Sequence, residues 1–209
     1  MLLIAISVTW LTVFSASQAN SRHPSFRVSP PSQCQQNGIN WIASTIRYVA
    51  FLYFNQLRHE VANGKQAPGE RPRLMYGTRY DCNLEKKASR LLKNNANLNP
   101  RYVVLKHSSS TTGTGFPFSA EILRAFKQWR GKQEIYSTLT SPNVPLFGCA
   151  HNYIRENGRM LEVICIFDKR NHHVSSKNLI QPCQRNKDCK WHPNSTCRAK
   201  LCWAPSPAS

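Results

Sequence analysis

The sequence predicts an α+β fold with a small, mainly antiparallel sheet and a short disulfide-rich tail. Three stretches repeat apolar residues at the three- and four-residue spacing of amphipathic helices. Two later stretches of strand-forming residues flank an Asn-Gly turn, which is typical of an antiparallel hairpin. The eight cysteines divide into four spread through the body and four crowded near the end. This order of helices, strand, helix and hairpin favours an α+β arrangement.

The N-terminal segment predicts export from the cell. Residues 1–19 carry no charged side chain and are largely apolar, and Ser17 and Ala19 are small residues of the kind that signal peptidase accepts. The alternative is a membrane anchor, but the apolar run is shorter than the roughly 20 residues that a spanning helix needs. We therefore expect a signal peptide over 1–19, a secreted, extracellular mature chain with no membrane span, and a flexible basic lead-in over 20–37.

The first helix is expected over Trp41–Ala62. Apolar residues recur there at helical spacing until Asn63 and Gly64 supply a stop. Because the helix is apolar on almost all sides near its middle, we expect it to be well buried. The segment 64–73 contains two prolines and two glycines, and it is expected to be a loop.

A second helix is expected after Asp81, which is a good N-cap residue. Its apolar residues form one face and its basic residues lie away from that face, so its exterior is mainly positive. The apolar face consists of Leu84, Ala88, Leu91 and Leu92. The basic side consists of Lys86, Lys87, Arg90 and Lys93.

A strand, a loop and a third helix are expected next. Tyr102–Leu105 is a short strand candidate. The segment 108–115 contains five consecutive hydroxyl residues and two glycines, so we expect a flexible loop there. The third helix starts at Ser119, ends near Gly131 and keeps its apolar residues on one side.

The hairpin is the best strand signal. Its arms, 146–154 and 159–167, flank Asn157-Gly158, a pair that favours the turn geometry required by strand twist. The arms carry Cys149 and Cys165. The spacing permits either a disulfide between the two strands or one from a strand to a helix.

The cysteines predict disulfides in two groups. In an oxidising compartment an even number of cysteines is expected to pair, and the closing pattern C-x5-C-x7-C-x4-C predicts a small stapled tail. Zinc binding by the tail cysteines is an alternative that secretion disfavours. The predicted disulfide cysteines are Cys34, Cys82, Cys149, Cys165, Cys183, Cys189, Cys197 and Cys202.

The chain is strongly basic, with 28 Lys and Arg against 10 Asp and Glu and a formal net charge of +18. Outside the cell such a protein tends to bind sulfated glycans, anionic lipid or shed nucleic acid, although a solubility role is the simpler interpretation. Surface charges bind polyanions without reading base sequence, so a sequence-specific nucleic-acid partner is not expected. The candidate polyanion-binding residues are Lys86, Lys87, Arg90, Lys93, Arg124, Lys127 and Arg130.

The sequence shows no pattern typical of an enzyme. It contains no G-x-S-x-G, H-E-x-x-H or phosphate-binding loop, and several acidic residues lie at helix starts or on presumed solvent faces, where capping explains them. A metal site at His172 and His173, with Asp168, is conceivable, but neighbouring positive charge opposes it. Asn194 begins a glycosylation sequon. We expect no catalytic residue, no metal ligand and no cofactor.

Short segments in the correct order together resemble the CAP superfamily, which includes cysteine-rich secretory proteins and insect venom allergens. FNQLR, from Phe54 to Arg58, resembles the H-N-x-x-R of its first helix, and YDCNLE, at 80–85, resembles W-D-C-x-L-E. FGCA at 147–150 and VICIF at 163–167 are similar to its hairpin. The cysteine tail is similar to that of venom-allergen-like secreted proteins of parasitic nematodes.

The resemblance implies a three-layer α-β-α sandwich, in which a small antiparallel sheet lies between helical layers. It also implies a central cavity where two histidines and two acidic residues can hold a divalent metal. The two histidine positions fall on Phe54 and Ile135 in this sequence. Because neither side chain offers a ligand atom, we expect the metal site to be lost.

The resemblance also implies a non-enzymatic protein that binds an extracellular or host protein, glycan or lipid, with immunomodulation as one outcome. The alternative is a carrier of a sterol, fatty acid or other small lipid, which an apolar groove lined by the first helix and 108–117 would favour. A residual metallo-hydrolase would require a cluster of histidine and glutamate. The expected units are a CAP-like domain over 38–178 and a cysteine-rich tail over 179–209.

Overall fold

The computed structural model describes Cys34 and residues 41–65, 71–94, 98–111, 118–141, 146–154, 159–169 and 181–205. Several sequence-based expectations fall outside these residues. They concern the signal peptide, most of the lead-in, the turn at Asn157 and Gly158, and the boundary near residue 179, all of which stay predictions.

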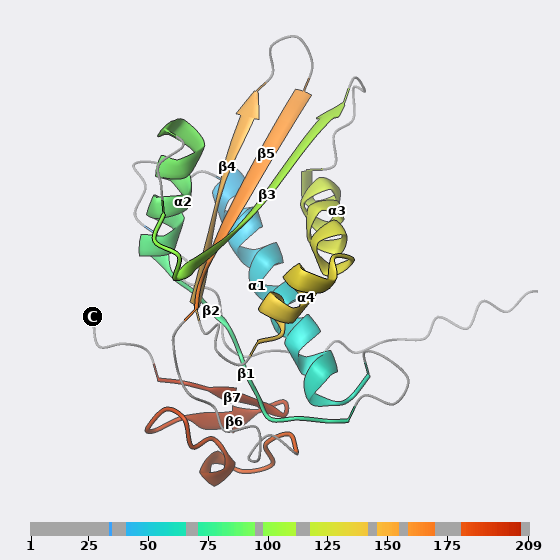
Figure 1. The fold of residues 1–209 in the computed structure, drawn as a ribbon, viewed down its shortest axis with the longest axis vertical. Helices are drawn as coiled ribbons and strands as arrows, with labels where there is room; N and C mark the ends of the chain where they lie inside the picture. The colour runs from blue at the N-terminus through green and yellow to red at the C-terminus, as the bar shows by residue number, and fades with distance from the viewer. Residues whose placement is uncertain are drawn as a thin grey trace, which may run out of the picture.

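A four-stranded sheet lies at the centre of the fold (Figure 1). Its spatial order is β2 (Arg79–Tyr80), β4 (Leu146–Ile154), β5 (Arg159–Asp168) and β3 (Tyr102–Thr111). The three long strands pair antiparallel, and β2 pairs parallel with the first two residues of β4. The hairpin expected from the sequence is therefore confirmed, apart from its turn.

The prediction of a loop over 108–115 is wrong for residues 108–111. Ser108, Ser109, Ser110 and Thr111 continue β3 and pair with residues 159–162 of β5. These hydroxyl residues show no alternation of apolar and polar side chains, so the pairing with β5, and not their own pattern, makes them a strand. The remainder of the expected loop lies outside the described residues.

Helices cover both faces of the sheet (Figure 1). α2 (Cys82–Asn94) packs on one face, while α1 (Trp41–Ala62), α3 (Phe118–Arg130) and α4 (Gln133–Leu139) lie on the other. The bounds of α1 and the start of α2 agree with the sequence expectation, and α3 differs by one residue at each end, whereas α4 was not expected. The result is the three-layer α-β-α sandwich that the resemblance implied.

The alternation along β5 explains these layers. Val163, Cys165 and Phe167 belong to the core with α1 and α3, whereas Ile164 and Ile166 pack with α2. Successive side chains on a strand point to opposite faces, so a strand that is apolar at every position is covered on both sides.

α1 is buried on its inner side only. Trp41 is 62% exposed and Tyr48 is 55% exposed, although the sequence pattern suggested burial all round. In the described part of the chain, no helix is long and apolar enough to cross a bilayer.

The cysteine-rich tail forms a second sheet with a strand of the body. The order is β1 (Met75–Tyr76), β7 (Leu201–Trp203) and β6 (Thr196–Arg198), and the 3-10 helix η2 (Asn186–Asp188) lies beside them. β1 pairs parallel with β7, and Trp203 lies in the main core. The tail is therefore packed onto the body and shares a sheet with it (Figure 1).

The cysteines form four disulfides. Cys34–Cys82 and Cys149–Cys165 lie in the body, the latter joining β4 to β5. Cys183–Cys197 and Cys189–Cys202 lie in the tail. Both bridges of the tail therefore stay within it, and the tail is held to the body by strand pairing and apolar packing.

Gly148 allows α2 to pack directly on β4. A Cβ atom at this position would lie 2.3 Å from the backbone nitrogen of Glu85 and 2.7 Å from the carbonyl oxygen of Asp81. Gly148→Ala is therefore expected to force α2 outward and to destabilise the protein by about 1–3 kcal/mol. Urea unfolding of this variant beside Gly131→Ala, whose added Cβ would meet nothing closer than 3.4 Å, tests the prediction. Equal midpoints for the two variants would contradict it.

Candidate functional site

Glu85, the one acidic residue of α2, points into the protein. Its Oε2 accepts a hydrogen bond from Arg47 Nε at 2.7 Å, and its Oε1 accepts one from Arg47 Nη2 at 2.6 Å. The Tyr80 hydroxyl lies 2.7 Å from Oε2 and donates to it. Burial raises the pKa of Tyr80 well above its usual range, so the phenol keeps the proton that this bond needs.

This cluster joins the two helical layers and leaves Glu85 no free oxygen. Arg47 belongs to α1, which covers one face of the sheet, and Glu85 belongs to α2, which covers the other. A carboxylate held in this way is not placed to act as a general base. The expectation that acidic residues near helix starts are caps holds for Asp81, whose Oδ1 accepts from the backbone N–H of Asn83 and Leu84. Capping does not explain Glu85, because its carboxylate bonds the side chains of Arg47 and Tyr80.

The positions of the family histidines do not fit a metal. Phe54 lies in an aromatic cluster, with its ring centroid 4.9 Å from that of Phe126 and 5.1 Å from those of Phe147 and Phe167. Ile135 lies on α4 and is partly buried against the same core. An aromatic ring and an aliphatic chain supply no ligand atom, so these two positions cannot bind a divalent ion.

The contacts of Asp168 do not support the hypothesis of a metal site formed by His172, His173 and Asp168. Asp168 is buried, and its carboxylate accepts two hydrogen bonds from the Arg101 guanidinium. His172 and His173 lie outside the described residues. Over the part of the chain that is described, the one group of three or more metal-ligating side chains is Cys183, Cys189 and Cys202, whose sulfurs are in disulfides.

The outer face of α2 is basic and not neutralised. Lys86, Arg90 and Lys93 are exposed, and their spacing of four and three residues places them in one stripe along the helix. Lys87 lies beside the stripe, with its Nζ 4.3 Å above the ring centroid of Tyr102. Within the described residues, none of these four cations has a carboxylate within ion-pair distance. The inward turn of Glu85 is the reason, because α2 has no other acidic residue.

The basic residues of α3 are in a different electrostatic setting. Arg124 Nη1 lies 2.6 Å from Glu121 Oε1, and Arg130 Nη2 lies 3.4 Å from Glu60 Oε2. Lys127 is exposed and has no ion pair within the described part of the chain. The seven candidate polyanion-binding residues thus form two separate groups, on helices that cover opposite faces of the sheet (Figure 1).

A groove of about 230 Å³ lies between the second half of α2 and strands β3 and β5. Its lining mixes the apolar Leu91, Leu92 and Ile164 with the charged Lys106 and Glu162. α1 does not line it, so it is not the apolar groove along the first helix that a lipid carrier was expected to need.

The glycosylation sequon lies at the edge of the tail sheet. Asn194 is exposed and has a φ of 59°, a left-handed conformation that asparagine tolerates. Ser195 is buried and its hydroxyl donates to the carbonyl oxygen of His192 at 2.7 Å. The exposure of Asn194 is compatible with a glycan, and its modification stays a prediction.

A family model described as "Ancylostoma-associated secreted protein related" matches residues 55–167, which is more than half of the chain. The match covers α1 after Phe54, α2, α3, α4 and the central sheet except Asp168, the last residue of β5. No curated protein sequence matches the chain.

Several solved structures share the fold. Ancylostoma-secreted protein Ac-ASP-7 is 23% identical, with a TM-score of 0.63 over 83% of this chain and 97% of that one. Na-ASP-1 is 21% identical, with a TM-score of 0.64 over 84% of this chain and 49% of that one. BmVAL-1 is 15% identical, with a TM-score of 0.61 over 85% of this chain and all of that one. At these identities the likeness shows the fold alone.

Proposed function

The chain belongs to the family of Ancylostoma-associated secreted protein related proteins, within the CAP superfamily, and we propose that it acts outside the cell by binding an extracellular or host polyanion. The superfamily is generally non-enzymatic. Membership of it supports a secreted, parasite-type protein. Four disulfides are consistent with an extracellular location.

The unneutralised stripe on α2 carries the proposal. Lys86, Arg90 and Lys93 present three cations on successive turns of one rigid helix, and Lys87 adds a fourth beside them. A linear chain of sulfate or carboxylate groups can lie along such a stripe and release the counterions of each group that it neutralises. Because these cations have no carboxylate partner to give up among the described residues, we expect binding to cost less there than on α3.

The filled core under α1 favours surface binding over a carrier function. Phe54 and Phe126 pack against each other between α1, α3 and the sheet, Phe51 packs against Trp203, and each of these phenylalanines is at most 1% exposed. A sterol or fatty acid would have to displace these rings to bind there, at the cost of close-packed contacts.

Salt-gradient elution from immobilised heparin tests the proposal. The informative variants are Lys86→Ala/Arg90→Ala/Lys93→Ala on α2 and Arg124→Ala/Lys127→Ala/Arg130→Ala on α3, which remove the same charge. We expect wild type to elute at higher salt than a folded protein of equal net charge, the α2 variant to elute clearly earlier, and the α3 variant to shift much less. Equal shifts for both variants would mean that total charge, and not an organised surface, retains the protein.

A further inference from the structure

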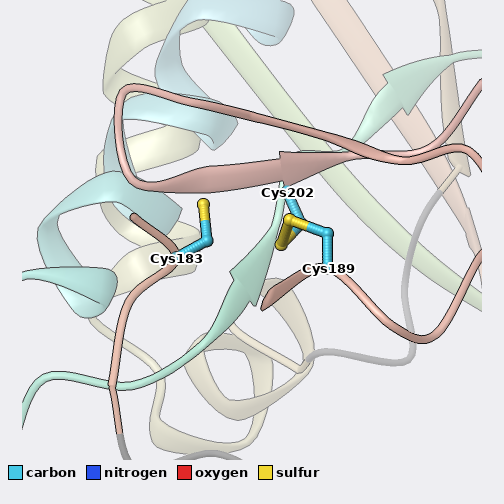
Figure 2. A group of neighbouring side chains, drawn as sticks. All are labelled: Cys183, Cys189 and Cys202. Carbon is cyan, nitrogen blue, oxygen red and sulfur yellow. A yellow bond between two sulfur atoms is a disulfide. The ribbon is translucent and has the colours of Figure 1, made fainter. Parts of the chain in front are cut away.

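The two disulfides of the tail lie against each other. The sulfur atoms of Cys183, Cys189 and Cys202 are all within 4.8 Å of one another, although Cys183 is bonded to Cys197 and not to either of the other two (Figure 2). Cys197 and Cys202 are also directly opposite each other in the pairing of β6 with β7. Four sulfurs thus form one cluster.

Accessibility distinguishes one member of this cluster. Cys183, Cys189 and Cys202 are buried, with exposures of 1%, 5% and 0%. Cys197 is only partly buried and lies on β6, the outer strand of the tail sheet. A thiol that approaches from solvent therefore meets Cys197 first.

The surroundings of Cys197 favour an anionic reactant. The tail presents exposed basic side chains around a single acidic residue, Asp188, whose carboxylate accepts from the backbone N–H of Gln184 and Arg185. Positive surroundings stabilise thiolates, which are the attacking species in disulfide exchange. The exposed basic residues of the tail are Arg185, Lys187, Lys190, Arg198 and Lys200.

We propose that Cys197 is a site of covalent modification by extracellular thiols, made durable by a disulfide relay within the tail. A thiolate attacks Cys197 Sγ, the Cys183–Cys197 bond breaks, and its electron pair passes to Cys183 Sγ. The Cys183 thiolate then attacks Cys202 Sγ, a Cys183–Cys202 disulfide forms, and the electron pair of the broken Cys189–Cys202 bond passes to Cys189 Sγ. One thiolate is consumed and one new thiolate is formed on the protein, while the number of disulfide bonds, with the mixed disulfide included, stays at two through both steps. No oxidant or reductant is therefore consumed.

The second step is what retains the adduct. Without it, the Cys183 thiolate would remain beside Cys197 and expel the incoming thiol at once, because an intramolecular attack has a high effective concentration. With the neighbouring disulfide in reach, Cys183 is taken up into a new bond. The thiolate that remains belongs to Cys189, which was not bonded to Cys197 and is not its neighbour in the pairing of β6 with β7.

Glutathione, as a representative anionic thiol, provides the test. The native protein is treated with glutathione at mildly alkaline pH, quenched with acid, alkylated and mapped as unreduced peptides. We expect glutathione on Cys197, a disulfide from Cys183 to Cys202, and the alkyl group on Cys189. The buried Cys149–Cys165 bridge should stay intact and reports that the protein remained folded. Alkylated Cys183 with an intact Cys189–Cys202 bridge, a first adduct elsewhere, or no adduct would overturn the proposal.

A variant without the second disulfide isolates the relay. Cys189→Ala/Cys202→Ala keeps Cys183–Cys197, so the first step remains and the second is impossible. After dilution of free glutathione, this variant should retain at least about tenfold less adduct than wild type. Equal retention would show that the neighbouring disulfide has no role. If the variant does not fold, the peptide map of the wild type decides the question by itself.

Discussion

Arg58→Met is expected to destabilise the protein by about 3 kcal/mol or more. The Arg58 side chain is completely buried, and its guanidinium donates to three backbone carbonyls and to no carboxylate among the described residues. Nε bonds Tyr76 at 2.6 Å, Nη1 bonds Leu139 at 2.7 Å and Nη2 bonds Ser141 at 2.9 Å. Methionine would fill much of the volume and remove all three of these hydrogen bonds.

The large effect follows from the three elements that Arg58 joins. Its acceptors lie on β1, at the end of α4 and just after α4, so one side chain of α1 holds the small sheet and α4 in place. Burial lowers the pKa of Arg58 to about 9, which still leaves the guanidinium protonated at neutral pH. Arg58→Lys should lose less stability than Arg58→Met, because it keeps the charge and can still bond one of the carbonyls. A denaturation midpoint for Arg58→Met within error of wild type would contradict this role.

Arg47→Met is expected to cost about 3–5 kcal/mol, since it would strand the Glu85 carboxylate in the interior. The side chains of Arg47 and Glu85 are 7% and 3% exposed, and the substitution removes both hydrogen bonds that Arg47 donates to Glu85. The loss of stability comes from burying the Glu85 carboxylate without Arg47, and not from the net free energy that the ion pair contributes to the fold.

The double variant Arg47→Met/Glu85→Leu tests this explanation. With both charges replaced by apolar side chains, the desolvation cost disappears, and we expect the double variant to be more stable than Arg47→Met alone. Urea midpoints of wild type, both single variants and the double variant give the coupling energy. A double variant less stable than Arg47→Met would show that the cluster stabilises the fold by some other means.

The elements with strong local patterns were predictable from the sequence. Trp41–Ala62 has apolar residues at helical spacing and an Asn-Gly stop, and α1 has these bounds. Asp81 begins α2 as a cap, and the hairpin strands lie as expected. In each case the residues that predict the element lie within the helix or strand itself or directly beside it.

What could not be predicted depends on residues far apart in the chain. Arg47 and Glu85 are separated by 38 residues, so neither indicates that the other will bury it. The strand character of Ser108 to Thr111 comes from β5, and β1 is a strand because it pairs with β7 at the far end of the chain. The basic faces of α2 and α3 look alike in the sequence. The inward orientation of Glu85 makes them different, because it takes the one carboxylate of α2 away from the basic face of that helix.

The salt dependence of binding to a defined heparin oligosaccharide tests the central claim most directly. Binding constants measured at several salt concentrations give a slope that counts the counterions released. We expect Lys86→Ala/Arg90→Ala/Lys93→Ala to flatten the slope by on the order of one unit for each cation removed. The variant with three substitutions on α3 should keep nearly the slope of wild type. A wild-type slope for the α2 variant would show that the outer face of α2 is not the contact surface.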